Sequence, residues 1–581
     1  MSFFKTKNAL AKAEFRGFGG IDTKDVTGRG GKAADIVNFR VLPDGTLKKR
    51  CGYRRVASMP GKTRAMLTGY FDGEFLGYVL ADGQVFKLDF ATGERTLIGS
   101  IGSISGDASI FYYLGNIFVI DGEEIYQLKE DEVVSARGYV PLFGKNWGSN
   151  YPGEINEPIN LLDPRARISY IVSDPPTIFL ATLYDVVSVE AVYLNDILLS
   201  PDKYVIDSDF KTINVTGLEA GDRVLVYLTF HPSVANRAEF VSNTNAVVFG
   251  GVNNSRVFMW GGEKKNVMYS SAHVTNSSLR ESQAVYPDST ALYFPAEYDF
   301  TVGDGRYDIT AVSRHYDRLL IFTSGDTWMA DSDACGTEYF PTMRINSENG
   351  CLSPKGCAKI GNDPISVGRG RIMKWTANTD RLEECNAYSV SDGIGELLTD
   401  SFFKSAAVHE DKWNGELLFA NSKDKNGRVF VYRASCDSWY TYEGIGADIF
   451  FDGPSSVGFT SGKDIFLFDD ELCEDKPSDS TSNVIEATFV SQPLDFGLSG
   501  RTKRLMMLNM EADLGGENIE VSFSSDKGIK SGGEIADEKS SGMSSYNKRI
   551  QSDRFTRTSM VIESRSSAPQ KVYGVKITVK P

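Results

Sequence analysis

Two short motifs in the sequence approach known ligand-binding patterns, and each lacks a residue that its chemistry requires. Gly31-Lys32 could end a phosphate-binding loop, but Ala33 stands where a hydroxyl side chain must hold magnesium. Residues 331–336 begin like a calcium loop, but Cys335 replaces an oxygen ligand. Histidines occur without metal-binding spacing, at positions 231, 273, 315 and 409. We therefore predict neither a metal nor a cofactor.

Carboxylates are abundant, so glycoside hydrolysis is the enzymatic alternative to consider. The reaction needs two carboxyl groups that face each other, and no spacing in the sequence singles out such a pair. Residues 524–528 resemble the start of an Asp-box turn, but Lys530 and Ser531 replace its Thr and Trp. Neither a Gly-x-Ser-x-Gly motif nor a Ser/His/Asp order is present. We predict that the chain has no catalytic residues and is not an enzyme.

Basic side chains gather most densely in the segment 38–55. The cluster comprises Lys48, Lys49, Arg50, Arg54 and Arg55. Such a run of charge is typical of a solvated loop or of an ion-paired structural arm. The functional alternative is contact with phosphate or with a partner protein.

The stretch 308–331 shows the predicted secondary structure of the chain most clearly. Apolar residues at 309–312 and 318–323 have strand length, and a polar corner separates them. A Ser-Gly-Asp turn then leads to 327–331, which contains Trp328. Short apolar runs separated by Gly and Asp predict consecutive antiparallel strands. We predict that this stretch is one blade of a β-propeller and that Trp328 packs within it.

Units of similar shape recur along the chain. Asp-Gly between two apolar runs is a strong hairpin signal because the tight turn needs positive φ. One sheet cannot bury both of its faces alone, whereas radial stacking of sheets buries them. We therefore predict an all-β fold with a propeller of six or seven divergent blades of ~35–45 residues each. The other units lie at 65–99, 108–140, 245–271, 358–375, 406–442 and, incompletely, 457–470.

Two segments interrupt the repeats. Residues 186–230 alternate between apolar and polar positions and predict a small β-sandwich inserted in a propeller loop. Residues 471–483 are acidic and rich in Ser, as in a linker, and 527–552 predict a mobile loop. The predicted domains are an N-terminal arm (1–60), a first propeller segment (61–153), the inserted β-sandwich (154–236), a second propeller segment (237–470), the linker (471–483) and a C-terminal β-sandwich (484–581).

Composition limits the function classes. The 581 residues carry a formal charge of −15, and residues 484–581 contain 14 Lys and Arg against 12 Asp and Glu. The acidic excess therefore lies in the body before residue 484, which argues against groove-reading of nucleic acid. No apolar run reaches ~18 residues, so no membrane span is expected. The seven cysteines lack a Cys-x-x-Cys pair and predict free cytoplasmic thiols.

Four segments resemble the tail propeller proteins of short-tailed bacteriophages, which are known as tail nozzle or packaged-DNA stabilisation proteins. NFRVLPDGTLKKRCGYRRV (38–56) is similar to the segment that leads into their first blade. The stretch 308–331 and NGCLSPKGCAKIGN (349–362) resemble a blade and the turn after it. FVSQPLDFGLSGRTKRLMML (489–508) resembles the start of their C-terminal sandwich.

The resemblance implies a structural protein of the virion tail that is made in the host cytoplasm. Its partners would be further copies in a ring, usually a homohexamer, the head-to-tail adaptor and portal proteins, and tail fibres or spikes. Double-stranded DNA would pass through the ring without sequence readout. In such a ring we expect assembly contacts from Lys48, Lys49, Arg50, Arg54, Arg55, Arg501, Lys503 and Arg504. The alternative is a tail protein that binds a host receptor or processes a glycan.

Overall fold

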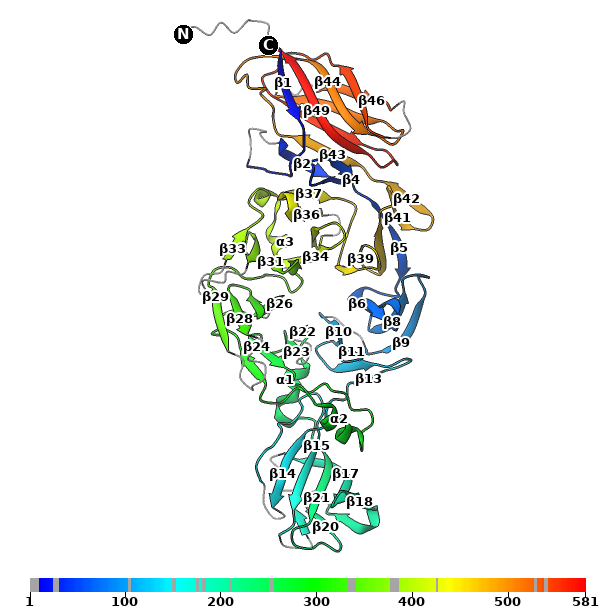
Figure 1. Cartoon of the computed structure of the whole chain (residues 1–581), viewed down its shortest axis with the longest axis vertical. Coiled ribbons are helices and arrows are strands. Elements are labelled where there is room, and N and C mark those ends of the chain that lie inside the picture. The colour runs from blue at the N-terminus through cyan, green and yellow to red at the C-terminus, as the bar shows by residue number, and fades with distance from the viewer. Residues whose placement is uncertain are drawn as a thin grey trace.

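The computed structural model describes residues 10–24, 31–102, 106–148, 153–173, 177–179, 184–208, 212–249, 255–316, 318–331, 341–376, 386–424, 427–526, 530–537 and 542–581. Strands make up 53% and helices 6% of it, which confirms the all-β class. A ring of sheets lies in the middle of the molecule, the C-terminal sheets lie at one end and an inserted unit at the other (Figure 1). Most of the calcium-like motif, together with Cys335 and Cys385, lies outside the described residues.

The stretch 308–331 forms three of the four strands of one antiparallel sheet, as predicted. The turn after its second strand is closed by the Thr323 hydroxyl, which donates to Asp326 Oδ1 at 2.5 Å. Trp328 Nε1 donates to the same oxygen at 2.9 Å, and its ring packs against a core shared with the preceding sheet. The strands are β26 (Ile309–His315), β27 (Arg318–Thr323), β28 (Thr327–Asp331) and β29 (Thr342–Asn346).

Six further sheets follow the same up-and-down order. Asp72-Gly73 and Asp82-Gly83 connect strands of the first one, and all four residues have the positive φ that the predicted hairpin turns require. The strands are β6 (Thr63–Phe71), β7 (Glu74–Ala81), β8 (Gln84–Asp89) and β9 (Arg95–Ser100); β10 (Ser109–Tyr113), β11 (Asn116–Ile120), β12 (Ile125–Leu128) and β13 (Val133–Ser135); β22 (Asn245–Phe249), β23 (Arg256–Trp260), β24 (Val267–Ser270) and β25 (Asp299–Thr301); β30 (Cys357–Ile360), β31 (Asp363–Val367), β32 (Ile372–Thr376) and β33 (Asn386–Ser389); β34 (Ala406–Asp411), β35 (Glu416–Asn421), β36 (Val429–Arg433) and β37 (Ser438–Tyr442); and β38 (Ile449–Asp452), β39 (Val457–Ser461) and β40 (Asp464–Asp469).

The first strands of these sheets contact one another around a ring (Figure 1). β6 contacts β10, and β10 contacts β22. The sheets that begin with β22 and β26 share one apolar core. β26 contacts β30, β30 contacts β34, β34 contacts β38, and β38 returns to β6. The sheets therefore bury their faces against their neighbours in the radial manner that the repeats predict.

A strand from the N-terminal segment completes the last sheet of the ring. β5 (Gly52–Ser58) pairs antiparallel with β40, with Ser58 opposite Asp464 and Gly52 opposite Asp469. On its other side β5 meets β41 (Glu474–Ser478), which forms a hairpin with β42 (Thr481–Val484). Residues 471–483, expected to be a linker, thus lie largely in a hairpin. The composition of 471–483 does not reveal the hairpin, because β41 bridges to β5, which lies more than 400 residues earlier in the sequence.

The inserted unit contains two sheets around its own core. The five-stranded sheet begins with β14, some residues before the predicted start of the insertion at 154. Its strands are β14 (Leu142–Gly148), β15 (Arg165–Ile171), β17 (Val186–Leu194), β18 (Ile197–Leu198) and β21 (Arg223–Phe230), and the second sheet contains β16 (Thr177–Phe179), β19 (Tyr204–Ile206) and β20 (Thr212–Val215). The α-helices of the described chain are α1 (Arg237–Val241), α2 (Asn276–Gln283) and α3 (Asp400–Ser405).

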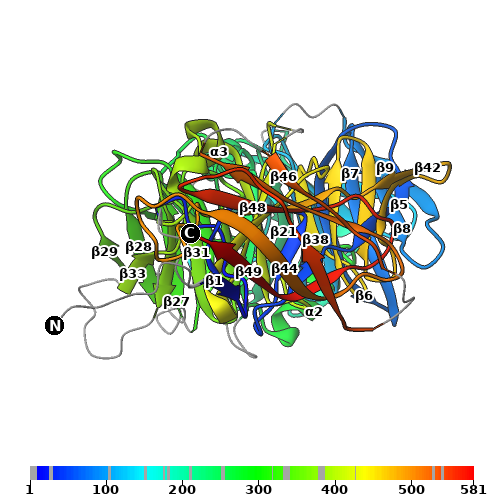
Figure 2. The same cartoon turned by 90° about the horizontal axis from the view of Figure 1, so that it is seen from above.

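Two sheets form the C-terminal end of the molecule and lie on opposite sides of it (Figure 2). The first has the order β3-β4-β49-β44-β47, and β1 pairs with β49; the second contains β2, β43, β48, β45 and β46. Some of the expected mobile loop at 527–552 is strand in both sheets. The strands are β43 (Ala487–Ser491), β44 (Arg504–Asp513), β45 (Ile519–Ser525), β46 (Lys530–Ile535), β47 (Ser544–Arg549), β48 (Thr558–Ser564) and β49 (Lys571–Lys580).

The N-terminal segment 1–60 is therefore not a separate arm within its described residues. β1 (Ala11–Phe15), β2 (Ala33–Val37), β3 (Phe39–Val41) and β4 (Leu47–Lys49) belong to the C-terminal sheets, whereas β5 belongs to the ring. β2 also bridges to β37, so one sheet continues from the ring into the C-terminal end. Local patterns cannot predict this because β1, β2 and β5 pair only with strands near the far end of the chain, and the β3-β4 hairpin joins its sheet through β49.

We expect Gly52→Ala to lower the melting temperature of the protein. A Cβ at Gly52 would lie 1.9 Å from the carbonyl oxygen of Glu474, so β5 and β41 would have to separate. The expected loss is roughly 1–3 kcal/mol of unfolding free energy. Gly395→Ala is the matched control, because its Cβ meets nothing within 4 Å. Equal melting temperatures of the two variants in thermal unfolding would contradict the close approach of β5 and β41.

Candidate functional site

The basic residues expected at assembly contacts divide into buried and accessible side chains. Lys49, Arg50 and Lys503 are at most 3% exposed. Lys49 donates to the carbonyl of Ser566, and Lys503 donates to the carbonyl of Thr556 at 2.6 Å. Since the chain's own oxygens already accept from these buried groups, the structure corrects the expectation that they contact another subunit. Lys48 and Arg55 are half-buried, and Arg54, Arg501 and Arg504 are exposed.

Arg50 joins the N-terminal segment to β41. Its two terminal nitrogens donate to both carboxylate oxygens of Asp475, at 2.8 and 2.6 Å. Its Nε donates to Asn38 Oδ1 at 2.8 Å, and the Glu443 carbonyl accepts a further hydrogen bond at 3.0 Å. Bidentate charge-assisted pairs of this kind are short and geometrically specific. Arg50 therefore fixes where the N-terminal segment meets the last sheet of the ring.

A second group of side chains donates hydrogen bonds to Glu416 on β35. Arg40 donates to Glu416 Oε1 through Nη2 at 2.7 Å and Nε at 3.0 Å. Arg433 donates to the same oxygen, and the hydroxyl of Tyr440 donates to it at 2.5 Å. The Glu416 side chain is only 1% exposed. Arg40 belongs to β3 of the C-terminal sheets, so this cluster connects those sheets to the ring.

A tyrosine paired with a carboxylate between arginines could act as a nucleophile, but this one is closed to substrate. Burial and the negative charge of Glu416 raise the pKa of Tyr440 well above its ordinary value, whereas a phenol nucleophile must lose its proton. The adjoining cavity, lined among others by Arg40, Arg50 and Trp413, measures about 20 Å³, room for a single water molecule. The cluster is therefore structural.

We expect Glu416→Gln to destabilise the protein by about 3–5 kcal/mol, because Arg40 and Arg433 would remain buried without their counter-charge. Chemical unfolding measures this change. Asp304→Asn removes one partner of an exposed ion pair and should change stability by at most about 1 kcal/mol. Adding Arg40→Met to Glu416→Gln should recover some of the loss. A Glu416→Gln variant as stable as the wild type would show that the cluster contributes nothing.

The central ring gathers charged side chains at both ends of its first strands. Three charged residues lie just before a first strand, namely Lys62, Asp107 and Asp448. All three are close enough to Lys355, which precedes β30, to shift its pKa. Crowding by surrounding protein lowers the pKa of Lys355 although its side chain is exposed, and the two carboxylates oppose this. The starts of four first strands therefore meet at one face of the ring.

The opposite face gathers the ends of the same strands. His409 Nε2 lies 3.0 Å from Asp452 Oδ1, and Lys412 Nζ donates to Oδ2 at 2.7 Å. Thr68 on β6 donates to the Asp452 carbonyl at 2.7 Å. Burial would raise the pKa of Asp452, but the hydrogen bonds from His409 and Lys412 lower it to about 2. This carboxylate therefore connects β34, β38 and β6 around the ring.

We expect the stability that Asp452 contributes to disappear on acidification. A carboxyl whose pKa is lowered by folding stabilises the protein fully above its ordinary pKa of 3.8 and loses this contribution as the pH falls towards about 2. Asp452→Asn should therefore melt below the wild type at about pH 6, and the difference should shrink towards about pH 3. A difference that does not change with pH would contradict the assigned ion pairs.

Aromatic side chains rise from the same face. Tyr70 is 72% exposed near the end of β6, and Tyr112 lies near the end of β10, where its ring meets Phe71 at 5.8 Å. Tyr316 and Trp413 follow β26 and β34 and are also exposed. Flat aromatic rings of this kind offer stacking surfaces for a partner. We call Tyr70, Tyr112, Tyr316 and Trp413 the aromatic rim.

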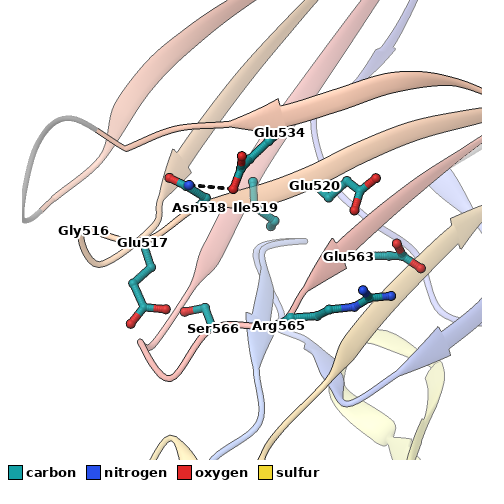
Figure 3. A pocket seen from close by; sticks show the side chains of 9 residues that line it. All are labelled: Gly516, Glu517, Asn518, Ile519, Glu520, Glu534, Glu563, Arg565 and Ser566. Carbon is teal, nitrogen blue, oxygen red and sulfur yellow. Dashed lines mark hydrogen bonds between the residues drawn. The ribbon is translucent and has the colours of Figure 1, made fainter.

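A hollow of about 690 Å³ lies on the C-terminal sheets (Figure 3). Four glutamates line it, Glu517, Glu520, Glu534 and Glu563, together with Arg565. Asn518 donates to Glu534 Oε1 at 2.6 Å. Hydrogen bonds from Ser566 and Ser567 lower the pKa of Glu517, so it carries its charge at neutral pH. Within the described ranges no group of His, Cys, Asp and Glu could hold a metal ion.

Sequence reasoning missed both buried ion pairs and the acidic hollow. Arg40 and Glu416 are 376 positions apart, and Arg50 and Asp475 are 425 apart. Glu520 and Glu563 become neighbours only through the pairing of β45 with β48. No local signal in the sequence could have found these partners. The five cysteines within the described residues are free thiols, namely Cys51, Cys351, Cys357, Cys436 and Cys473.

No helix of the described chain is long and apolar enough to cross a membrane.

Comparison with known proteins leaves the family open. No protein-family model and no curated protein matches the chain. Among solved structures, the β-propeller domain of Cps50 (Swd1) from Myceliophteria thermophila is 8% identical, with 72% of this chain and 98% of that one covered and a TM-score of 0.33. PorZ, a surface component of the type-IX secretion system of Porphyromonas gingivalis, is 11% identical, with 79% and 44% covered and a TM-score of 0.34. A glycoside hydrolase reaches a TM-score of 0.25 at 10% identity, with 90% and 99% covered. At these scores the likenesses carry nothing about function.

Proposed function

We propose that the ring is a seven-bladed β-propeller and that the inserted unit and the C-terminal sheets are two β-sandwiches. The count rests on the seven first strands, β6, β10, β22, β26, β30, β34 and β38. In this arrangement β5 supplies the outermost strand of the seventh blade, so the ends of the propeller chain hold each other.

We further propose that the protein is a structural component of a phage tail, without enzymatic activity. Copies of the chain form a ring, as a nozzle or hub, that continues the DNA channel below the portal and adaptor. The ring helps to retain packaged DNA and carries peripheral tail proteins. The observation that carries this proposal is the use of the buried charges: Arg40 and Arg50 bind Glu416 and Asp475 and join the ring to the C-terminal sheets. Rigid joints between modules suit a building block.

Two further features support the proposal. The segment that resembles tail propeller proteins, residues 38–56, is the segment that forms these joints. The body is acidic, and an acidic channel wall repels phosphate and lets DNA slide, whereas a basic wall holds DNA through counterion release.

Electron microscopy of the purified protein and of virions tests this function. We expect closed rings, with six copies as the usual number, and the same ring at the tail axis of the virion. A protein that stays monomeric or trimeric at the periphery of the tail would contradict the conduit. A ring whose lumen is strongly basic would contradict the sliding argument while leaving the ring itself in place.

The aromatic rim favours a second candidate, a tail protein that binds a host glycan. Sugar rings stack on exposed Tyr and Trp side chains. If this candidate is correct, Tyr70→Ala and Trp413→Ala should weaken binding of the protein to the host surface polysaccharide. Val205→Ala, at an exposed apolar residue of the inserted unit, is the control. Equal binding by all three variants and the wild type would exclude the rim as a glycan site.

A further inference from the structure

Rows of opposite charge cross the outer faces of the two C-terminal sheets. On one face Glu534, Glu520 and Glu563 stand side by side on β46, β45 and β48, since each is the direct cross-strand partner of the next. Thr488 continues this row on β43. Neighbouring strands lie about 4.8 Å apart, so the three carboxylates form one row about 10 Å long. Like charges directly opposite each other on a sheet are destabilising. We call this row the acidic face.

The other sheet turns basic side chains outward. One row crosses four strands, with Lys12 opposite Thr578, Thr578 opposite Met507 and Met507 opposite Arg549. Arg504 and Lys580 form a neighbouring cross-strand pair. Lys12, Arg504, Arg549 and Lys580 are exposed, and Met507 is 43% exposed between them. We call Lys12, Arg504, Met507, Arg549 and Lys580 the basic face.

The two faces cannot neutralise each other within one chain. Their sheets are packed core to core, and apolar side chains such as Leu508, Val521 and Ile562 fill the space between them. Figure 2 shows β44 and β49 on one side of this end of the molecule and β46 and β48 on the other. Each face therefore points away from the other, and each is complementary in charge to the other face of a second copy.

We propose that the C-terminal sheets of neighbouring copies stack face to face, with the acidic face of one copy on the basic face of the next. The proposal rests on the ring proposed above and names one contact within it. The row from Lys12 to Arg549 spans three strand spacings, about 14 Å, which is enough to cover the acidic row. A contact between two different faces is heterologous, and such contacts close into rings when the rotation permits. Met507 supplies an apolar anchor at the centre of the contact.

Charge argues for a second copy rather than DNA as the occupant of the acidic face. Three adjacent glutamates repel phosphate, whereas basic side chains on an opposing sheet relieve their mutual repulsion. DNA could compete only for the basic face, and a variant with that face reversed in charge distinguishes this outcome.

Two charge-reversal variants of the full chain test the contact. The first carries Glu520→Lys, Glu534→Lys and Glu563→Lys, so that both faces become basic. The second carries Lys12→Glu, Arg504→Glu and Arg549→Glu, so that both become acidic. Five of the six side chains are exposed and Glu563 is half-buried, which favours unchanged folding, and thermal unfolding verifies it. The control carries Glu123→Lys, Glu130→Lys and Asp131→Lys, three exposed acidic residues of the ring with the same change of charge as the first variant.

Mass photometry and analytical ultracentrifugation report the assembly. We expect the concentration for half-assembly to rise more than about a hundredfold in each reversal variant, whereas the control assembles like the wild type. An equimolar mixture of the two variants should assemble again with alternating copies, because each acidic face then meets a basic face. Wild-type assembly should weaken as salt rises from about 0.05 to 0.5 M.

Other results would overturn the contact. If either variant alone assembles like the wild type, copies meet elsewhere, and the ring function stands without this contact. If both variants disperse and the mixture stays dispersed, their complementarity is refuted. If the second variant assembles normally but loses DNA binding in a filter assay, the basic face takes nucleic acid. A wild type that remains monomeric at all concentrations would refute the ring itself, and this contact with it.

Discussion

Two buried charge clusters hold the ring and the C-terminal sheets in one arrangement. Arg40 reaches from the C-terminal sheets to Glu416 in the ring, and Arg50 binds Asp475 beside β5. A charge taken out of water is costly unless its partner is placed well, so these pairs tolerate little displacement. They therefore act more on geometry than on net stability. Any relative motion of the ring and these sheets would leave a guanidinium buried without its carboxylate, and this keeps the joint rigid.

The N-terminal segment can make this joint because its first strands belong to the C-terminal sheets and its last strand belongs to the ring. β1 to β4 add to the C-terminal sheets, and β5 then crosses to close the ring against β40. Closure of the ring thus waits for the last strands of the ring, since β40 and β41 must exist before β5 has a partner. Contacts between residues more than 400 positions apart are slow to form because loop closure precedes their gain. Local hairpins of the ring, such as the one at Asp82-Gly83, can form before these distant contacts.

How much could be predicted from the sequence follows the same division between local and distant contacts. The strands at 309–331 and the Asp-Gly turns were predictable, because a turn that needs positive φ selects its own residues. The role of Lys49, Arg50 and Lys503 was not, because a buried cation and an exposed one have the same local sequence. The 471–483 segment looked like a linker since its polar residues suit solvent, yet its backbone finds β5.

The charges at the C-terminal end show that strand pairing decides how charge is distributed, which composition does not reveal. Residues 484–581 are nearly neutral in sum, yet the registers of β45, β46 and β48 bring three glutamates together on one face. Lys12 arrives on the opposite face from the other end of the chain, through β1. Strand alternation sorts charges by face without regard to their sum. A buried cation such as Arg50 has its counter-charge within its own chain. A row of exposed like charges, in contrast, is accounted for only by a partner of opposite charge. The exposed rows, rather than the buried Lys49 and Arg50, are therefore the charges of this chain that remain available to a neighbour.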